Sequence, residues 1–202
     1  MKIMIPGGSG QVGTVLARAL HQEGHDVVVL SREPQPRPWR VVGWDGVSLG
    51  AWVSELNKCD AVINLAGRSV NCRYTAANRE AIMQSRVVST RLVGHAIARV
   101  RRPPGVWLQA STATIYAHRY DAPNDEASGL VGGNEPSAPS TWRFSIDVAR
   151  AWEAAFASAK RCCRPYAVAL NQVFATFAAI DWRANSKSAR TAASVSWAAL
   201  RA

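Results

Sequence analysis

At 202 residues the chain is long enough to form one domain with a sizeable core. Apolar residues make up 48% and charged residues 19%, a composition that excludes a wholly disordered chain. The net charge of +10 makes nucleic-acid binding a function to consider. However, residues 1–159 carry 17 Lys and Arg against 13 Asp and Glu, while residues 160–202 carry 7 Lys and Arg against 1 Asp. The excess belongs to the end of the chain and comes without a recognised basic-aromatic motif, so we expect no nucleic-acid partner.

The four cysteines form no CxxC pattern and have no histidine at metal-ligand spacing: Cys59, Cys72, Cys162 and Cys163. They predict neither a metal site nor a disulfide framework. The first residues contain no apolar run of signal-peptide length, and no stretch approaches the length of a membrane span. We therefore expect a cytoplasmic protein with no membrane partner.

The first predicted unit is strand, turn, helix, strand. Residues 2–5 are mostly apolar and run into Gly7-Gly8-Ser9-Gly10, after which apolar residues recur at helical spacing until Gly24. Residues 26–30, DVVVL, form a β-branched run typical of a strand buried on both faces of a parallel sheet.

The later elements follow in alternation. Three prolines between residues 33 and 40 predict a loop; strands are expected at 60–66, 106–110 and 166–170, and a long helix at 76–101. A Pro- and Gly-rich stretch at 119–141 predicts a long loop, followed by a helix capped by Ser145 or Asp147. This alternation predicts an α/β fold, a Rossmann-type doubly wound parallel sheet over residues 1–170, with ligand at the carboxyl ends of the strands.

The turn after the first strand is the strongest motif. Gly7-Gly8-Ser9-Gly10-Gln11-Val12-Gly13 satisfies GxGxxG between a predicted strand and a predicted helix. Glycine lets the backbone approach a pyrophosphate, whose charge meets free N–H groups at the helix N-terminus. The motif predicts a dinucleotide site, the alternative being a plain tight turn.

The end of the second strand carries Ser31-Arg32, where an NAD enzyme would place an acidic residue on the ribose. A guanidinium there can hold a 2′-phosphate by paired charged hydrogen bonds. We therefore predict NADP as the cofactor, with NAD as the alternative; a solvated surface arginine is the competing interpretation.

Several ordered segments resemble the extended short-chain dehydrogenase/reductases, in the group called NAD-dependent epimerase/dehydratase. The matching text covers residues 1 to about 170: IPGGSGQVG, LSR, WD at 44–45, DAVINLAG, REAIMQSRVVSTRLV, STATIY and AWE. The resemblance implies that Leu65, Ala66 and Gly67 line the adenosine side of the cofactor and that Arg86 approaches it from the long helix. A solvated helix face is the alternative for Arg86.

The resemblance implies less for catalysis. STATIY matches the segment that supplies an active-site hydroxyl, here Thr112, which would hold a substrate oxygen during hydride transfer. The family's YxxxK motif falls on Ser145 and Ala149, which cannot exchange a proton as Tyr and Lys do. Tyr116 and Tyr120 are the candidate substitutes, with packing as the alternative for both.

Beyond residue 170 the resemblance ends. Residues 171–202 contain no glycine and ten alanines, and we expect a divergent tail in place of the family's substrate lobe. Such text fits either a shifted reading frame or a native short paralogue. The leading hypothesis is an NADP-linked oxidoreductase or epimerase acting on a small carbonyl or sugar-like substrate. The alternative is a cofactor-binding protein, impaired or truncated, that has no turnover.

Overall fold

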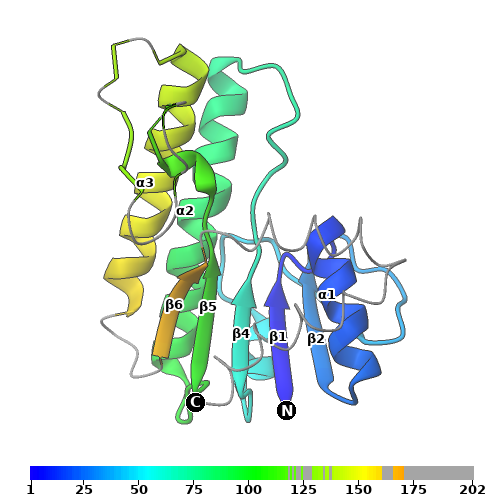
Figure 1. The fold of residues 1–202 in the computed structure, drawn as a ribbon. Coiled ribbons are helices and arrows are strands. Elements are labelled where there is room, and N and C mark those ends of the chain that lie inside the picture. Colours follow the sequence, from blue (N-terminus) through cyan, green and yellow to red (C-terminus); the bar gives the residue numbers. More distant parts are fainter. Residues whose placement is uncertain are drawn as a thin grey trace.

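The computed structural model describes residues 1–117, 119, 121, 124, 129–133, 135, 136, 138–160 and 166–170; for 160 and 166–170 it describes the backbone only. These residues form a parallel sheet with helices on both faces (Figure 1). The expected α/β class is confirmed.

The sheet has six strands in the order β3-β2-β1-β4-β5-β6, and every neighbouring pair is parallel. Their bounds are β1 Lys2–Pro6, β2 Asp26–Ser31, β3 Arg40–Gly43, β4 Ala61–Asn64, β5 Val106–Ala110 and β6 Tyr166–Leu170. This is a doubly wound order whose direction reverses between β1 and β4. Ligands of such sheets bind outside the carboxyl ends of the strands at that reversal.

Alternate residues of the strands feed two separate cores. Ile3, Ile5, Val27 and Val29 face α1 (Gln11–Gln22), whereas Met4 and its neighbours Val28 and Leu30 face the other side. On that other side lie α2 (Ala76–Arg99), α3 (Ser140–Lys160) and the short helix η1 (Ala51–Leu56). Because strand side chains alternate in direction, a continuous apolar run fills both cores at once.

The helices α2 and α3 pack side by side, as Figure 1 shows. A Cβ on Gly94 of α2 would lie 2.6 Å from the Cβ of Ala159 on α3, so only glycine permits this approach. Between the helices, the Trp152 indole N–H donates to the Thr90 hydroxyl at 3.0 Å. Ser111, just after β5, donates to the Glu153 carboxylate at 2.6 Å. These contacts fix α3 relative to the end of β5.

The structure adds three elements to those expected and corrects the predicted helix caps. The strand β3 and the short helices η1 and η2 (Ala113–Ile115) were not predicted, because none has the length or periodicity of a regular buried element. α3 begins at Ser140, so the predicted caps are wrong: Ser145 lies inside the helix, where its hydroxyl donates to the Thr141 carbonyl at 3.1 Å.

The expected loop at 119–141 lies partly outside the described residues, and the tail at 171–202 lies outside them entirely. What is described of the loop is anchored at its base. Ala117 N–H donates to the Leu130 carbonyl at 2.7 Å, and Gly132 N–H donates to the Ile115 carbonyl at 2.9 Å. No helix in the described part of the chain is long and apolar enough to cross a membrane.

Candidate functional site

A cleft lies at the carboxyl ends of β1, β2, β3 and β4, where the strand order reverses; we call it the switch-point cleft. Its volume is about 340 Å³. It is lined by the loops after these four strands and by one face of α2: Gly7, Ser9, Gly10, Leu30, Ser31, Arg32, Trp44, Asp45, Gly46, Val47, Ala66, Gly67, Arg68, Gln84, Ser85, Val88 and Ser89. Six of the twelve predicted cofactor residues are among them.

Three glycines of the GxGxxG loop are required by the fold itself. Gly7 has φ +75°, and a Cβ there would lie 2.6 Å from the Cα of Ala66. Cβ atoms on Gly8 and Gly13 would lie 2.9 Å from the Ile5 carbonyl oxygen and 2.4 Å from the Gly8 Cα. These glycines bring β1, α1 and the β4 loop into close contact, which is a structural role that any βαβ turn of this kind requires.

Gly10 is different. A Cβ there would meet only the Gly7 carbonyl oxygen, at an ordinary 3.7 Å, and its φ of −71° suits any residue. The fold therefore has room for a side chain at Gly10. Its carbon is exposed and faces the switch-point cleft, where a side chain would occupy ligand space.

Gly10 is the N-cap of α1, and no side chain caps this helix end. The N–H groups of Gln11, Val12 and Gly13 belong to the first turn, which has no partners within the helix. Uncapped N–H groups and the positive end of the helix dipole attract an anion. Gln11, Val12 and Gly13 thus contribute backbone rather than side chains to the site.

The residues after β2 fall into two roles. The Ser31 side chain is buried, with its Oγ 3.1 Å from the Ser9 Oγ and 3.0 Å from the Glu33 carbonyl oxygen, so it ties the two loops together. Arg32 is exposed on the cleft and makes no hydrogen bond or ion pair with another described residue. Its guanidinium is available to a ligand.

The loop after β4 forms the opposite wall. Asn64 is fully buried and its Oδ1 accepts from the Ala66 N–H at 3.1 Å, which fixes the backbone where Ala66 and Gly67 line the cleft. Leu65 instead packs against the core on the α1 side.

Arg86 lies behind this wall. Its Nη1 donates to the carbonyl oxygens of Arg68 and Ile82, both at 3.1 Å, and its guanidinium carbon lies 5.2 Å from the centre of the Trp152 ring. Burial lowers the pKa of Arg86. The hydrogen bonds of Arg86 to the carbonyl oxygens stabilise the loop after β4. A contact between Arg86 and a ligand therefore stays a prediction.

Asp45 was not predicted as a site residue, although it lines the switch-point cleft. Its carboxylate accepts from the N–H groups of Val47 and Ser48, both at 2.8 Å, and from the Ser48 hydroxyl. These hydrogen bonds, the Ser48 hydroxyl first, lower the pKa of Asp45 to about 2. The signal available in the sequence was DGVS, a turn in which an aspartate accepts from the following N–H groups.

A second cleft, of about 470 Å³, opens beside the start of α3 and is lined by Val70, Cys72, Tyr74, Thr114, Thr141, Trp142 and Ser145. The predicted catalytic Thr112 is its neighbour. The Thr112 Oγ1 lies 3.0 Å from the Thr114 Oγ1 and accepts from the Thr114 N–H at 3.3 Å, capping η2. Of these two threonines, Thr114, which was not predicted from the sequence, is the one that lines the cleft.

Of the other positions considered for catalysis, Ser145 lines the second cleft, Tyr116 and Ala149 are buried, and Tyr120 lies outside the described residues. Tyr116 is 6% exposed and packs with Ile115 and Ala149 in a small apolar cluster. Ala149, at the family's lysine position, has no exposed surface. The role predicted for Tyr116 stays a prediction, and its surroundings are those of a packing residue.

The described residues fit a phosphate-bearing nucleotide better than a metal ion. The cleft has backbone N–H donors, an exposed arginine and open space beside Gly10. No group of three or more potential metal ligands occurs within the described ranges. Of the four cysteines, the two that are described are free thiols, Cys59 and Cys72.

Comparison with known proteins agrees with this geometry. The model of the NAD dependent epimerase/dehydratase family matches residues 3–169. The epimerase family protein SDR39U1 of Bos taurus is 32% identical over 158 residues, which are 77% of this chain and 48% of the relative. The epimerase family protein YfhF of Bacillus subtilis is 37% identical over 120 residues, 57% of this chain and 39% of that protein. The chain spans about half the length of the SDR39U1 relatives.

Two solved structures share the fold at recognisable identity. The crystal structure of human SDR39U1 with NADPH superposes with a TM-score of 0.63 at 30% identity, covering 77% of this chain and 48% of that one. A nucleoside-diphosphate sugar epimerase from Corynebacterium glutamicum gives 0.64 at 26% identity, over 85% and 33%. The chain belongs to the NAD dependent epimerase/dehydratase family.

Proposed function

We propose that this chain binds NADP(H) in the switch-point cleft, as the dinucleotide-binding part of an oxidoreductase or epimerase. The observation that carries the proposal is the difference among the loop glycines: Gly7, Gly8 and Gly13 are packed against backbone, whereas Gly10 faces the cleft beside an uncapped helix end. A turn that served folding alone would have no need of glycine at position 10.

The predicted cofactor residues would contact different parts of the dinucleotide. The N–H groups of Gln11, Val12 and Gly13 would hold the pyrophosphate, and Gly7, Gly8 and Gly10 keep the backbone close to it. Ser31 and Arg32 would face the ribose and its 2′-phosphate, and Ala66 and Gly67 the adenosine. The relative of known structure at 30% identity was solved with NADPH, which supports NADP over NAD.

The substrate would be a small carbonyl or sugar-like compound. Family membership supports this class, as does the name of the 26% identical nucleoside-diphosphate sugar epimerase. The chemistry that a bound nicotinamide supplies is hydride transfer. The chain's own contribution would be a hydroxyl, Thr112 or its neighbour Thr114, that donates to the substrate oxygen.

Binding without turnover is the second candidate function. Its support is that Ala149 and Tyr116 are buried in one apolar cluster, and that Ser145 bonds back to its own helix. None of these three side chains is arranged to exchange a proton with a substrate. Cytoplasmic residence, the lack of a nucleic-acid partner and the change of domain near residue 170 also stay predictions.

Fluorescence titration of the purified chain with NADPH and NADH tests the proposal. We expect NADPH to bind more tightly, and Arg32→Ala to weaken NADPH about tenfold or more while changing NADH less than about twofold, because one charge-assisted pair is lost. Arg18→Ala, an exposed arginine of α1 outside both clefts, is the control. Equal affinities for the two cofactors would contradict the proposal.

Turnover separates the two candidate functions. NADPH oxidation followed at 340 nm with a panel of aldehydes, ketones and nucleotide sugars should give a rate if the oxidoreductase function holds. Tight NADPH binding with no NADPH oxidation across the panel favours the second candidate function, binding without turnover.

A further inference from the structure

The second cleft, beside the start of α3, is lined by uncharged residues throughout the described part of the chain. Two of them are aromatic, Tyr74 and Trp142, and three carry hydroxyls, Thr114, Thr141 and Ser145. Its volume of about 470 Å³ lies within the range of small-molecule sites, which usually combine apolar and aromatic walls with a few polar groups. The lining therefore carries information about the kind of ligand that fits.

The Trp142 ring is held by a hydrogen bond from its own nitrogen. Its Nε1–H donates to the carbonyl oxygen of Tyr116, the C-cap of η2, at 3.3 Å. The backbone N–H of Trp142 donates to the Pro139 carbonyl at 2.9 Å, which fixes the first turn of α3. A ring that is already oriented loses little conformational freedom when a ligand packs against it.

The second ring, Tyr74, comes from the loop between β4 and α2. It makes an edge contact with the Phe144 ring, with the ring centres 5.4 Å apart. The guanidinium carbon of Arg79 lies 5.8 Å from the centre of the Tyr74 ring, and its Nε donates to the Tyr74 carbonyl at 3.3 Å. Two aromatic rings fixed by separate elements thus line one cleft, and such rings pair favourably with an aromatic ring of a ligand.

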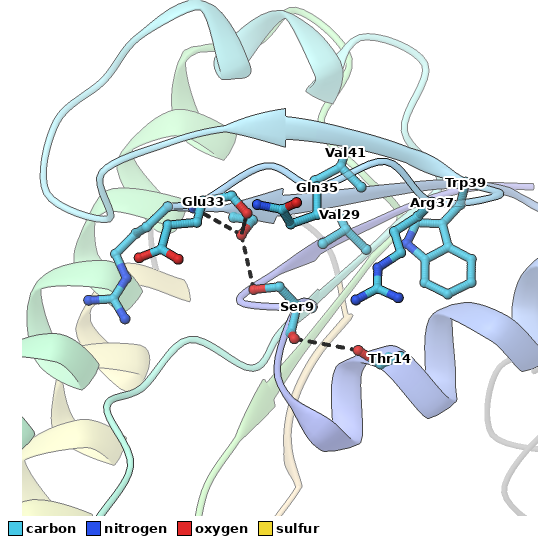
Figure 2. A pocket seen from close by; sticks show the side chains of 11 residues that line it. Ser9, Thr14, Val29, Glu33, Gln35, Arg37, Trp39 and Val41 are labelled. Carbon is cyan, nitrogen blue, oxygen red and sulfur yellow. Dashed lines mark hydrogen bonds between the residues drawn. The ribbon is translucent and has the colours of Figure 1, made fainter.

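The charged side chains nearby do not line this cleft. Arg73 and Arg143 each adjoin a lining residue in the sequence, but neither is part of the lining. Charged residues gather elsewhere: Arg32 lines the switch-point cleft, and Figure 2 shows Arg37 and Glu33 beside the connection from β2 to β3. Because an anionic group that leaves water requires a charged partner, the second cleft suits a neutral ligand.

The hydroxyls leave little polar bonding capacity for a ligand. The Ser145 hydroxyl donates its hydrogen to the Thr141 carbonyl at 3.1 Å, so its oxygen can only accept. The Thr114 Oγ1 lies 3.0 Å from the Thr112 Oγ1, and either can be the donor. When Thr112 is the donor, the Thr114 hydrogen is available to a ligand carbonyl. One such bond orients a ligand, and packing against the rings supplies most of the contact.

We propose that the second cleft takes an uncharged carbonyl compound that carries an aromatic ring, and not a nucleoside-diphosphate sugar. Tyr74 and Trp142 select the ring, and Thr114 donates to the carbonyl oxygen. The inference rests on the proposed function, because it narrows the substrate class of that oxidoreductase.

Protection of Cys72 from iodoacetamide reports occupancy of this cleft without requiring turnover. Cys72 is a free, partly exposed thiol that lines the cleft, and trypsin releases it in the peptide 69–73. Cys59 is the internal control: burial raises the pKa of its thiol to about 11, so its peptide should react slowly throughout.

Three probes are titrated against the full chain with NADP present. We expect 2-acetylnaphthalene to protect Cys72 at concentrations at least about fivefold lower than its saturated analogue 2-acetyldecalin, because only the first has aromatic rings. UDP-glucose should give no protection at about 1 mM, because its diphosphate finds no cation in the cleft.

Two leucine variants identify the residues responsible. Trp142→Leu and Tyr74→Leu should each weaken 2-acetylnaphthalene about tenfold and leave NADPH affinity within about twofold. Arg143→Ala, an exposed neighbour of Trp142 outside the cleft, should change neither. Far-ultraviolet circular dichroism checks that each variant is folded, and if Trp142→Leu is not, Tyr74→Leu decides alone.

Several results overturn the inference. They are protection by UDP-glucose at lower concentration than by 2-acetylnaphthalene, equal protection by the saturated analogue, and an affinity for 2-acetylnaphthalene that neither leucine variant changes. If the unaltered chain does not bind NADPH, the proposed function fails and the inference with it. If NADPH binds but 2-acetylnaphthalene leaves Cys72 unprotected, only the inference fails.

Discussion

The switch-point cleft and the second cleft both open beyond the carboxyl ends of strands, but their polar groups are used differently. In the first, no side chain caps the helix end at Gly10, and the Arg32 side chain has no hydrogen bond or ion pair with another described residue. In the second region, Thr112 caps η2, Ser145 bonds to its own helix, and Tyr116 packs against Ala149.

This difference indicates which of the two clefts has polar groups available to bind a ligand. A polar group whose bonding capacity is met by its own chain contributes to stability, and one left open at a concave surface is available to a ligand. By that criterion the cofactor side is equipped for binding, whereas the side expected to carry catalysis is largely occupied by packing. Substitutions in the switch-point cleft should therefore change cofactor affinity, whereas substitutions around the second cleft should change the free energy of unfolding.

The largest effect is expected from Ala149→Lys, which restores the family's residue at its lysine position. Ala149 has no exposed surface and packs with Ile115 and Tyr116, so the ammonium would be buried without a partner. We expect a loss of about 3 kcal/mol in the free energy of unfolding, measured by urea denaturation.

Ala154→Lys is the matched control for this prediction, because Ala154 is an exposed alanine of the same helix. It should change stability by less than about 0.5 kcal/mol. If both variants were equally stable, position 149 would not be buried in an apolar cluster. The contrast between the second cleft and the switch-point cleft would then be weaker.

A somewhat smaller effect, on binding alone, is expected from Gly10→Val. The backbone at Gly10 suits any residue and a Cβ meets nothing closer than 3.7 Å, so the sheet should form and far-ultraviolet circular dichroism should be unchanged. The side chain would displace phosphate from the N–H groups of α1, and NADPH affinity should fall about a hundredfold.

Gly50→Val is the control for the binding variant. Gly50 also has a negative φ, of −156°, and a Cβ there would meet only the Trp52 ring at 3.7 Å, away from the switch-point cleft. It should leave NADPH affinity unchanged. Full affinity in Gly10→Val would show that the glycine loop is a turn and nothing more.

The smallest effect is expected from Thr112→Val. The Thr112 Oγ1 accepts from the Thr114 N–H and caps η2, so its loss should cost about 1 kcal/mol in the free energy of unfolding and leave the NADPH dissociation constant unchanged. Thr112→Ser, which keeps the hydroxyl, should restore stability. A variant that lost NADPH affinity but not stability would show that Thr112 contributes to the cofactor site and not to the stability of the fold.

The long β-branched and helical runs determined the class of this protein. The strands at 106–110 and 166–170 have the predicted bounds, and the helix over 76–101 ends two residues early. Apolar period and glycine spacing are local properties, and they suffice for β1, α1 and β2. The family resemblance likewise followed from ordered text, and the family match confirms it.

Other features depended on contacts between residues far apart in the chain. β3 is a strand because it pairs with β2 and Trp39 covers the core, although its four residues lie just after a proline-rich loop. Which loop glycines are structural also depended on distant contacts, since Gly7 is constrained by Ala66 and Gly10 by nothing nearby. The sequence determined which residues could bind phosphate or exchange protons. Only packing decided which remained open, because the burial of Tyr116 and Ala149 and the exposure of Arg32 arise when separate elements meet.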